Sequence, residues 1–155
     1  MQNPDWMKKA LDEAYSANAA GEVPVGAVLV DEKGEMIAVA HNLTETNRSA
    51  LAHAELLVIA EGCKRKKSRR LSGCTLYVTL EPCPMCAGAI IGARIPKVVI
   101  AAKDPRAGAF GSLLDLNRYP LESGPEIVFG SGEKESLALL RSFFEAKRTE
   151  KERIE

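Results

Sequence analysis

Residues 75–86 read Thr-Leu-Tyr-Val-Thr-Leu-Glu-Pro-Cys-Pro-Met-Cys. The first half is an apolar run rich in β-branched and aromatic residues, which is typical of a buried strand. Pro84 favours the first turn of a helix, because its missing N–H would have no partner there. The stretch therefore predicts a strand over residues 74–80 and a helix over residues 84–93, with two cysteines at the point where one gives way to the other.

Strand and helix patterns alternate on both sides of this stretch. The valine-rich run at residues 23–30 and the segment 35–41 predict a hairpin around the polar turn at 31–34. Further strands are expected at residues 97–102 and 126–129, and helices at residues 6–20, 52–63 and 133–153, with a short helix near 112–116. This order predicts an α/β fold, a three-layer α/β/α sandwich with a five-stranded mixed sheet.

Length and composition limit the class of protein. The chain has 155 residues and no internal repeat or linker-like tract, so residues 1–155 are expected to form a single domain. The 21 basic and 21 acidic residues balance, which argues against binding nucleic acid through bulk positive charge. The apolar stretches are far shorter than the roughly 20 residues of a membrane span. Without a membrane span or a signal segment, we expect a cytoplasmic protein that does not bind a membrane.

A metal site is indicated by two cysteines and a histidine. Cys83 and Cys86 lie about one helical turn apart, so both sulfur atoms can face the same point. A helix N-terminus favours the thiolate, which is the form that binds metal, and His53 can add a nitrogen ligand. Three protein ligands leave the fourth position of zinc for water, as in catalytic sites. Glu55, two residues after His53, is a candidate for general acid/base work.

Two other kinds of site share the Cys-x-x-Cys spacing, namely thioredoxin-like redox pairs and structural zinc knots. A redox pair does not explain His53-Ala-Glu55. A knot needs a fourth ligand, which neither His41 nor Cys63 nor Cys74 supplies at a matching spacing. The complete set instead matches the H-x-E…P-C-x-x-C signature of zinc-dependent nucleobase deaminases.

Over nearly its whole length the chain resembles the bacterial tRNA adenosine deaminases of the cytidine-deaminase-like superfamily. The matching stretches are residues 21–28, 52–55, 76–83 and 85–88, continued at 94–95, 104, 108–109, 111–112 and 143–144. The resemblance implies a cytidine deaminase-like fold and zinc held by His53, Cys83 and Cys86, with Glu55 as the proton shuttle.

The same resemblance implies roles for two further residues and an assembly. It places Asn42 at the base or ribose and the backbone N–H of Ala54 against the reacting base. From the residues alone, Asn42 is equally a common turn former. The resemblance also implies a homodimer in which both subunits contribute to the rim of the active site.

The expected reaction is the conversion of adenosine to inosine at the wobble position of a tRNA anticodon loop. Two loops depart from the family pattern: residues 49–52 read Ser-Ala-Leu-Ala instead of Asp/Gln-Pro-Thr-Ala, and residues 121–125 lack an Asn-His pair. These departures favour an alternative, a deaminase of a free nucleobase or small heterocycle of the guanine, cytosine or pterin type. A non-catalytic subunit is disfavoured because Glu55 is present.

Two basic segments are candidates for contacting RNA. Residues 64–70 hold six basic residues in seven positions, and the run is interpreted either as a solvated connector or as an RNA contact. The last predicted helix carries a second basic set at residues 147–153. Leu137, Leu140, Phe143 and Phe144 recur at helical spacing there and predict an apolar face that packs on the sheet.

Overall fold

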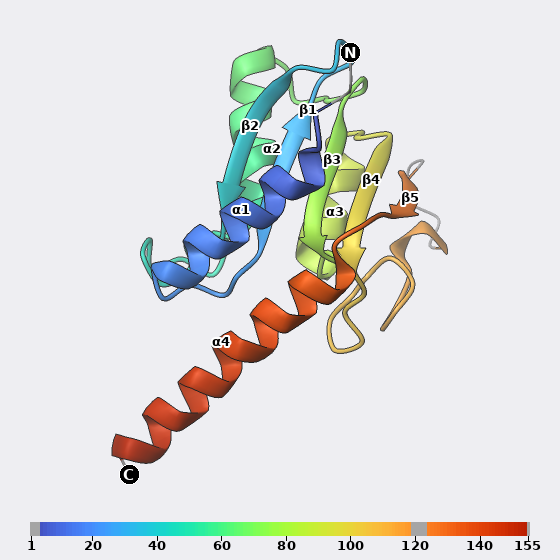
Figure 1. The fold of residues 1–155 in the computed structure, drawn as a ribbon. Helices are drawn as coiled ribbons and strands as arrows, with labels where there is room; N and C mark the ends of the chain where they lie inside the picture. Colours follow the sequence, from blue (N-terminus) through green and yellow to red (C-terminus); the bar gives the residue numbers. More distant parts are fainter. Residues whose placement is uncertain (1–3, 119–123, 155) are drawn as a thin grey trace.

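The computed structural model in Figure 1 describes residues 4–118 and 124–154. Its strands are β1 (Gly26–Val30), β2 (Met36–His41), β3 (Thr75–Leu80), β4 (Lys97–Ala102) and β5 (Glu126–Phe129). The helices are α1 (Trp6–Ala19), α2 (Ala54–Lys66), α3 (Pro84–Gly92) and α4 (Glu133–Ile154), with a short 3₁₀ helix η1 at Leu116–Arg118. Among the described residues, no helix is long and apolar enough to cross a membrane.

The five strands form one mixed sheet in the order β2-β1-β3-β4-β5. β1 pairs antiparallel with both of its neighbours, whereas β3, β4 and β5 are parallel. All five residues of β1 are buried, as the valine-rich run predicts for a strand covered on both faces. The predicted α/β class and five-stranded mixed sheet are therefore confirmed.

Helices cover both faces of the sheet (Figure 1). The alternation along β4 shows the two layers, since Val98 and Ile100 join one core cluster while Val99 and Ala101 belong to the other. The first cluster includes residues of α2 and α3, and the second includes residues of α1. The three-layer arrangement follows from this two-residue period.

The prediction of a short helix near residues 112–116 is wrong. The chain makes turns there, and the 3₁₀ helix begins at Leu116. The backbone N–H and the hydroxyl of Ser112 both donate to the Glu81 carboxylate, and Gly111 has a φ of 129°. Residues 110–115 close a tight turn, in which the Gly111 N–H donates to the Leu114 carbonyl at 2.9 Å and Phe110 pairs with Asp115, and the bonds to Glu81 hold this turn in place. This tertiary structure overrides the local pattern.

A close contact between α1 and β1 requires glycine at position 26. A Cβ on Gly26 would collide with the carbonyl oxygen of Ala10 and lie 2.8 Å from the backbone nitrogen of Ala14. The Gly26 N–H donates to Thr79 Oγ1 at 3.1 Å, and Ser136 Oγ donates to the Thr79 carbonyl at 2.7 Å. Thr79 thereby links β1, β3 and α4 inside the fold.

Replacing Gly26 by alanine should destabilise the protein, because backbone atoms of α1 cannot move aside as a flexible side chain can. We expect the free energy of unfolding to fall by about 1–3 kcal/mol in urea denaturation. Gly73→Ala is the matched control, since a Cβ at Gly73 meets only side-chain atoms of Glu32, which can move aside. That substitution should change the free energy of unfolding by less than about 1 kcal/mol. A Gly26→Ala protein as stable as the control would contradict the packing described.

Candidate metal centre

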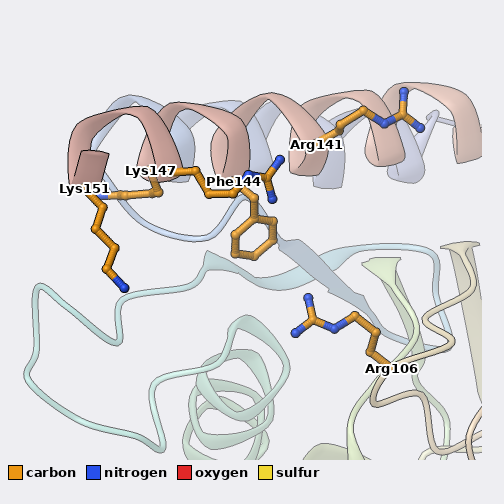
Figure 2. A pocket seen from close by; sticks show the side chains of 6 residues that line it. Arg106, Arg141, Phe144, Lys147 and Lys151 are labelled. Atoms are coloured by element: carbon orange, nitrogen blue, oxygen red, sulfur yellow. The ribbon is translucent and has the colours of Figure 1, made fainter. Parts of the chain in front are cut away.

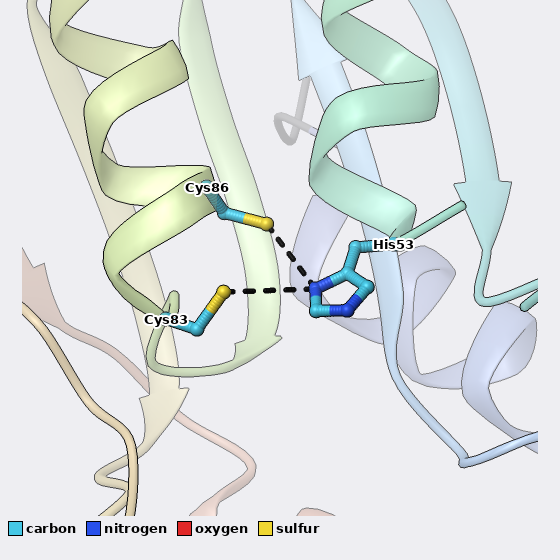
Figure 3. Close-up of side chains that lie close together, drawn as sticks. All are labelled: His53, Cys83 and Cys86. Atoms are coloured by element: carbon cyan, nitrogen blue, oxygen red, sulfur yellow. Dashed lines mark hydrogen bonds between the residues drawn. The ribbon is translucent and has the colours of Figure 1, made fainter. Parts of the chain in front are cut away.

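Two helix N-termini meet at one end of the sheet and bring three side chains together. His53 is the N-cap of α2, and Cys83 is the N-cap of α3, with Pro84 in the first turn. His53 Nδ1 lies 3.4 Å from Cys86 Sγ and 3.7 Å from Cys83 Sγ (Figure 3). Residues 30 and 33 positions apart in sequence thus converge on one point, as the two motifs predict.

The donor set fits a zinc ion. Tetrahedral zinc with ordinary Zn–S and Zn–N bond lengths places a nitrogen and a sulfur ligand about 3.5 Å apart, between the two observed distances. The ligand atoms of His53, Cys83 and Cys86 all lie within 4.8 Å of one another. In residues 4–118 and 124–154, no other histidine, cysteine, aspartate or glutamate joins this group. The set therefore provides three ligands and leaves room for a fourth that is not protein.

The pKa values of the two cysteines diverge because they share a hydrogen bond. The bond from Cys86 lowers the pKa of Cys83 to about 5, helped by the backbone N–H groups of Cys86 and Met85 at the start of α3. The same bond, together with burial, raises the pKa of Cys86. One thiolate is therefore available at neutral pH before any metal binds, which favours metal capture.

Glu55 lies on the first turn of α2 and is 4% exposed. Burial raises the pKa of its carboxyl to about 7, against the lowering effect of its own backbone hydrogen bond and of His53. The side chain lines a cavity of about 250 Å³, which is also lined by His53 and Cys83. A carboxyl with a pKa near neutrality beside a metal-binding set is suited to accepting and donating a proton.

Asn42 lies at the end of β2 and lines the same cavity. Its Oδ1 accepts a hydrogen bond from the Ala54 N–H at 2.8 Å, so the two residues expected to contact a substrate contact each other. This bond also fixes the first residue of α2 relative to the end of β2. Their roles toward a substrate stay predictions.

A groove leads from the cavity to α4. Asp104 and Ala107 border both the cavity and a second hollow of about 530 Å³. Arg106, Arg141 and Phe144 border this second hollow and a third of about 390 Å³, which is also lined by residues 147, 148 and 151 (Figure 2). The shared lining residues show that the three hollows adjoin one another between the candidate metal centre and a basic surface.

The groove corrects one expectation about α4. Phe143 is buried as predicted, but Phe144 is 39% exposed and points into the groove. The Phe144 ring lines the hollows that Arg106 and Arg141 also border, and it packs edge-to-face with the ring of Phe143. The prediction that Phe144 packs on the sheet is therefore wrong.

The basic run at residues 64–70 lies away from this groove. It begins in the last turn of α2, whereas His53 caps the first turn of the same helix. One of its lysines, Lys66, pairs with Glu32 at 3.1 Å. With α2 rising about 1.5 Å per residue, roughly 15 Å of helix separates the start of the run from the first residue of α2.

Two buried glutamates were assigned no role from the sequence. Glu22 and Glu81 are 0% and 2% exposed, and each carboxylate accepts hydrogen bonds from a loop at the rim of the cavity. The sequence feature that could have indicated them is an acidic residue flanked by apolar ones, in Gly-Glu-Val-Pro-Val and Thr-Leu-Glu-Pro-Cys.

Of the segment 121–125, which departs from the family pattern, residues 121–123 lie outside the described residues.

Three comparisons place the chain among known proteins. The family described as cytidine and deoxycytidylate deaminase zinc-binding region matches residues 1–102. The tRNA-specific adenosine deaminase of Bacillus subtilis (strain 168) is 50% identical over 151 residues, which cover 97% of this chain and 93% of that protein.

Solved structures agree with the sequence comparisons. A structure from a study of A-to-I editing by tRNA:A34 deaminases at the wobble position of transfer RNA has a TM-score of 0.83 at 43% identity, and the match covers 87% of this chain and 98% of that one. A guanine deaminase from Nitrosomonas europaea has a TM-score of 0.74 at 25% identity, covering 89% and 82%. The chain therefore belongs to the cytidine and deoxycytidylate deaminase zinc-binding family and, within it, to the tRNA-specific adenosine deaminases.

Proposed function

We propose that this protein converts adenosine to inosine at the wobble position of a tRNA anticodon loop by zinc-dependent hydrolytic deamination. The observation that carries the proposal is that the cavity at Glu55 adjoins, through shared lining residues, the basic groove along α4. A base in a single-stranded loop can enter such a cavity with little unpairing cost while the backbone on either side follows the groove.

The chemistry follows from the residues that line the cavity. A zinc ion bound by His53, Cys83 and Cys86 would act as a Lewis acid that activates water for attack on C6 of the purine. Glu55 takes a proton from the attacking water and passes it to the exocyclic nitrogen, which leaves as ammonia. Glu55 is buried in the first turn of α2, which keeps the carboxyl beside the reacting atoms and limits the access of competing water.

Asn42 is assigned to positioning the base. Because its Oδ1 already accepts from the Ala54 N–H, its Nδ2 is the group left to donate to a substrate. Among the described residues, no hydrogen-bond partner for this Nδ2 is observed. Ala54 then acts by holding the Asn42 amide in one orientation through its N–H.

The groove also separates the two candidate substrates. The cavity of about 250 Å³ lies below the roughly 300 Å³ at which pockets for larger ligands begin, so it suits one base. A free base such as guanine, the substrate class of the Nitrosomonas europaea relative, would need the cavity alone. Arg106, Arg141 and Phe144 line a hollow outside this cavity, which a free base in the cavity would not fill. Their presence supports the RNA substrate.

Assembly and compartment complete the proposal. We assign residues 1–155 to one deaminase domain that works as a homodimer in the cytoplasm. The free thiols of Cys63 and Cys74 agree with a reducing compartment. α3 presents Met85, Gly88 and Gly92 on an exposed face, and a Cβ at either glycine meets nothing within 4 Å. Such a smooth face permits close approach of a second subunit.

The role of Glu55 is tested by the isosteric change Glu55→Gln. We expect one zinc per chain in both proteins, because Glu55 is not a ligand. The rate of inosine formation should fall by a factor of about 10²–10⁴ in the variant. Metal analysis and inosine quantification in tRNA are the two measurements. A Gln variant with turnover close to that of the wild type, or a wild type without zinc, would contradict the assignment.

The groove is tested by charge removal at its wall. Changing Arg141, Lys147 and Arg148 to glutamine should raise KM for tRNA at least tenfold and reduce its salt dependence by about one unit of slope per lost phosphate contact. The matched control neutralises three exposed residues of the distant run, Lys64, Arg69 and Arg70, with the same change in net charge. Equal effects of the two triple variants would show that net charge, and not the groove, governs RNA binding.

The dimer face is tested by Gly92→Arg. The new side chain points into open space within one subunit, so folding should be unaffected, but it should block a partner. Light scattering at micromolar concentration should give a dimer for the wild type and a monomer for the variant, and the variant should keep the circular dichroism spectrum of the wild type. A monomeric wild type, or a dimeric variant, counts against this interface.

A further inference from the structure

Two loops without regular secondary structure line the cavity. One follows β2 and contributes Thr44, and the other follows β4 and contributes Asp104 and Ala107. A loop held only by its ends would have to be ordered each time a substrate binds, at a cost in conformational entropy. In this protein, each loop is tied by a buried carboxylate to a segment next to a strand, namely the connection between α1 and β1 for Glu22 and the residue after β3 for Glu81.

Glu22 ties the first loop. Its Oε1 accepts hydrogen bonds from the Glu45 N–H at 3.1 Å and the Thr44 hydroxyl at 3.4 Å, and its Oε2 accepts from the N–H and the hydroxyl of Thr46, both at 2.6 Å. Burial alone would raise the pKa of the Glu22 carboxyl. The hydrogen bonds from these three residues outweigh burial, so the pKa is lowered from its ordinary value. The group is therefore a carboxylate at neutral pH, and the next residue along the chain, Val23, lines the cavity.

Glu81 ties the second loop in the same way. Its Oε1 accepts from the Asp104 N–H at 3.1 Å and from the Ser112 hydroxyl, and its Oε2 accepts from the N–H groups of Phe110 at 3.0 Å and Ser112 at 3.2 Å. A Cβ at Gly108 would collide with this carboxylate, so the loop folds around it. Glu81 is two residues from Cys83, so the loop is held at a set position relative to a candidate metal ligand.

We propose that Glu22 and Glu81 are positioning residues for substrate binding, which hold the two rim loops in the conformation that receives the RNA. The inference rests on the proposed function, because the second loop carries Arg106 of the groove as well as Ala107 of the cavity. Each carboxylate belongs to a segment that lines the cavity, and it accepts hydrogen bonds from a loop that also lines the cavity. Neither is a catalytic residue, because each acts on the substrate through the loop that it holds.

The variants Glu22→Gln and Glu81→Gln test this directly. In both residues each oxygen accepts at least one backbone N–H, so an amide in place of the carboxylate must turn its NH₂ against a donor. We expect KM for tRNA to rise about tenfold and kcat to change less than threefold, because the loops must then be ordered at binding. Zinc content should stay at one per chain.

Asp31→Asn is the matched control. The Asp31 carboxylate accepts hydrogen bonds from the N–H groups of Lys33 and Glu35, both at 2.9 Å, in the turn between β1 and β2 at the far end of β1 from the cavity. Asp31→Asn removes the charge of one carboxylate without touching the rim, and its amide oxygen can still accept both bonds, so it controls for the loss of charge alone. Its KM and kcat should match those of the wild type.

Hydrogen exchange gives a readout that needs no substrate. Peptides covering residues 43–49 should exchange faster in Glu22→Gln, and peptides covering 104–112 should exchange faster in Glu81→Gln, while β1 and β3 stay protected. If either Gln variant fails to fold, Thr46→Val and Ser112→Ala remove one hydroxyl donor each and leave the backbone donors in place. These should shift KM in the same direction by a smaller factor.

The outcomes separate this proposal from the proposed function. A wild type that forms no inosine in tRNA refutes the function, whatever the exchange of the loops. A wild type that forms inosine, with Gln variants whose loops exchange faster but whose KM equals that of Asp31→Asn, overturns the positioning role alone. A fall in kcat at unchanged KM would also overturn it, since that pattern belongs to a residue acting on the reacting atoms.

Discussion

The approach of two helix N-termini within one metal-coordination sphere is the constraint on which the site depends. His53 precedes α2 and Cys83 precedes α3, and His53 Nδ1 lies 3.4 Å from the Cys86 sulfur and 3.7 Å from the Cys83 sulfur. Both helices cover the same face of the sheet, so the order of β1, β3 and β4 beneath them sets their separation. A shift of either helix by one ångström would place a ligand outside bonding distance of zinc.

Charged groups inside the fold are used in two different ways around this centre. Glu55 is buried at the metal-binding set with a pKa raised to about 7, which suits a group that must both take and give a proton. Glu22 and Glu81 are buried among N–H and O–H donors, which keeps a carboxylate acceptor in place and fixes the loops around it. Similar side chains thus serve chemistry or architecture according to the donors that surround them.

The metal-binding set could be predicted from the sequence because each half of it is local. Cys83, Pro84 and Cys86 specify a helix start by themselves, and His53 with Glu55 specifies another. The groove could not, since Arg106 and Phe144 meet only after β5 and α4 have folded back, and helical spacing alone cannot tell a buried ring from an exposed one. The mistaken short helix near residue 112 has a similar origin, a long-range hydrogen bond to Glu81.

The central claim is that the cavity deaminates adenosine presented by RNA and not a free base. The most direct measurement compares ammonia release from a tRNA anticodon stem-loop with that from guanine, cytosine, adenine and a pterin, with inosine at the wobble position quantified in parallel. The account predicts inosine and an equal amount of ammonia from the RNA, and negligible release from the free bases. Efficient deamination of guanine or another free base, with no inosine in the RNA, would contradict it.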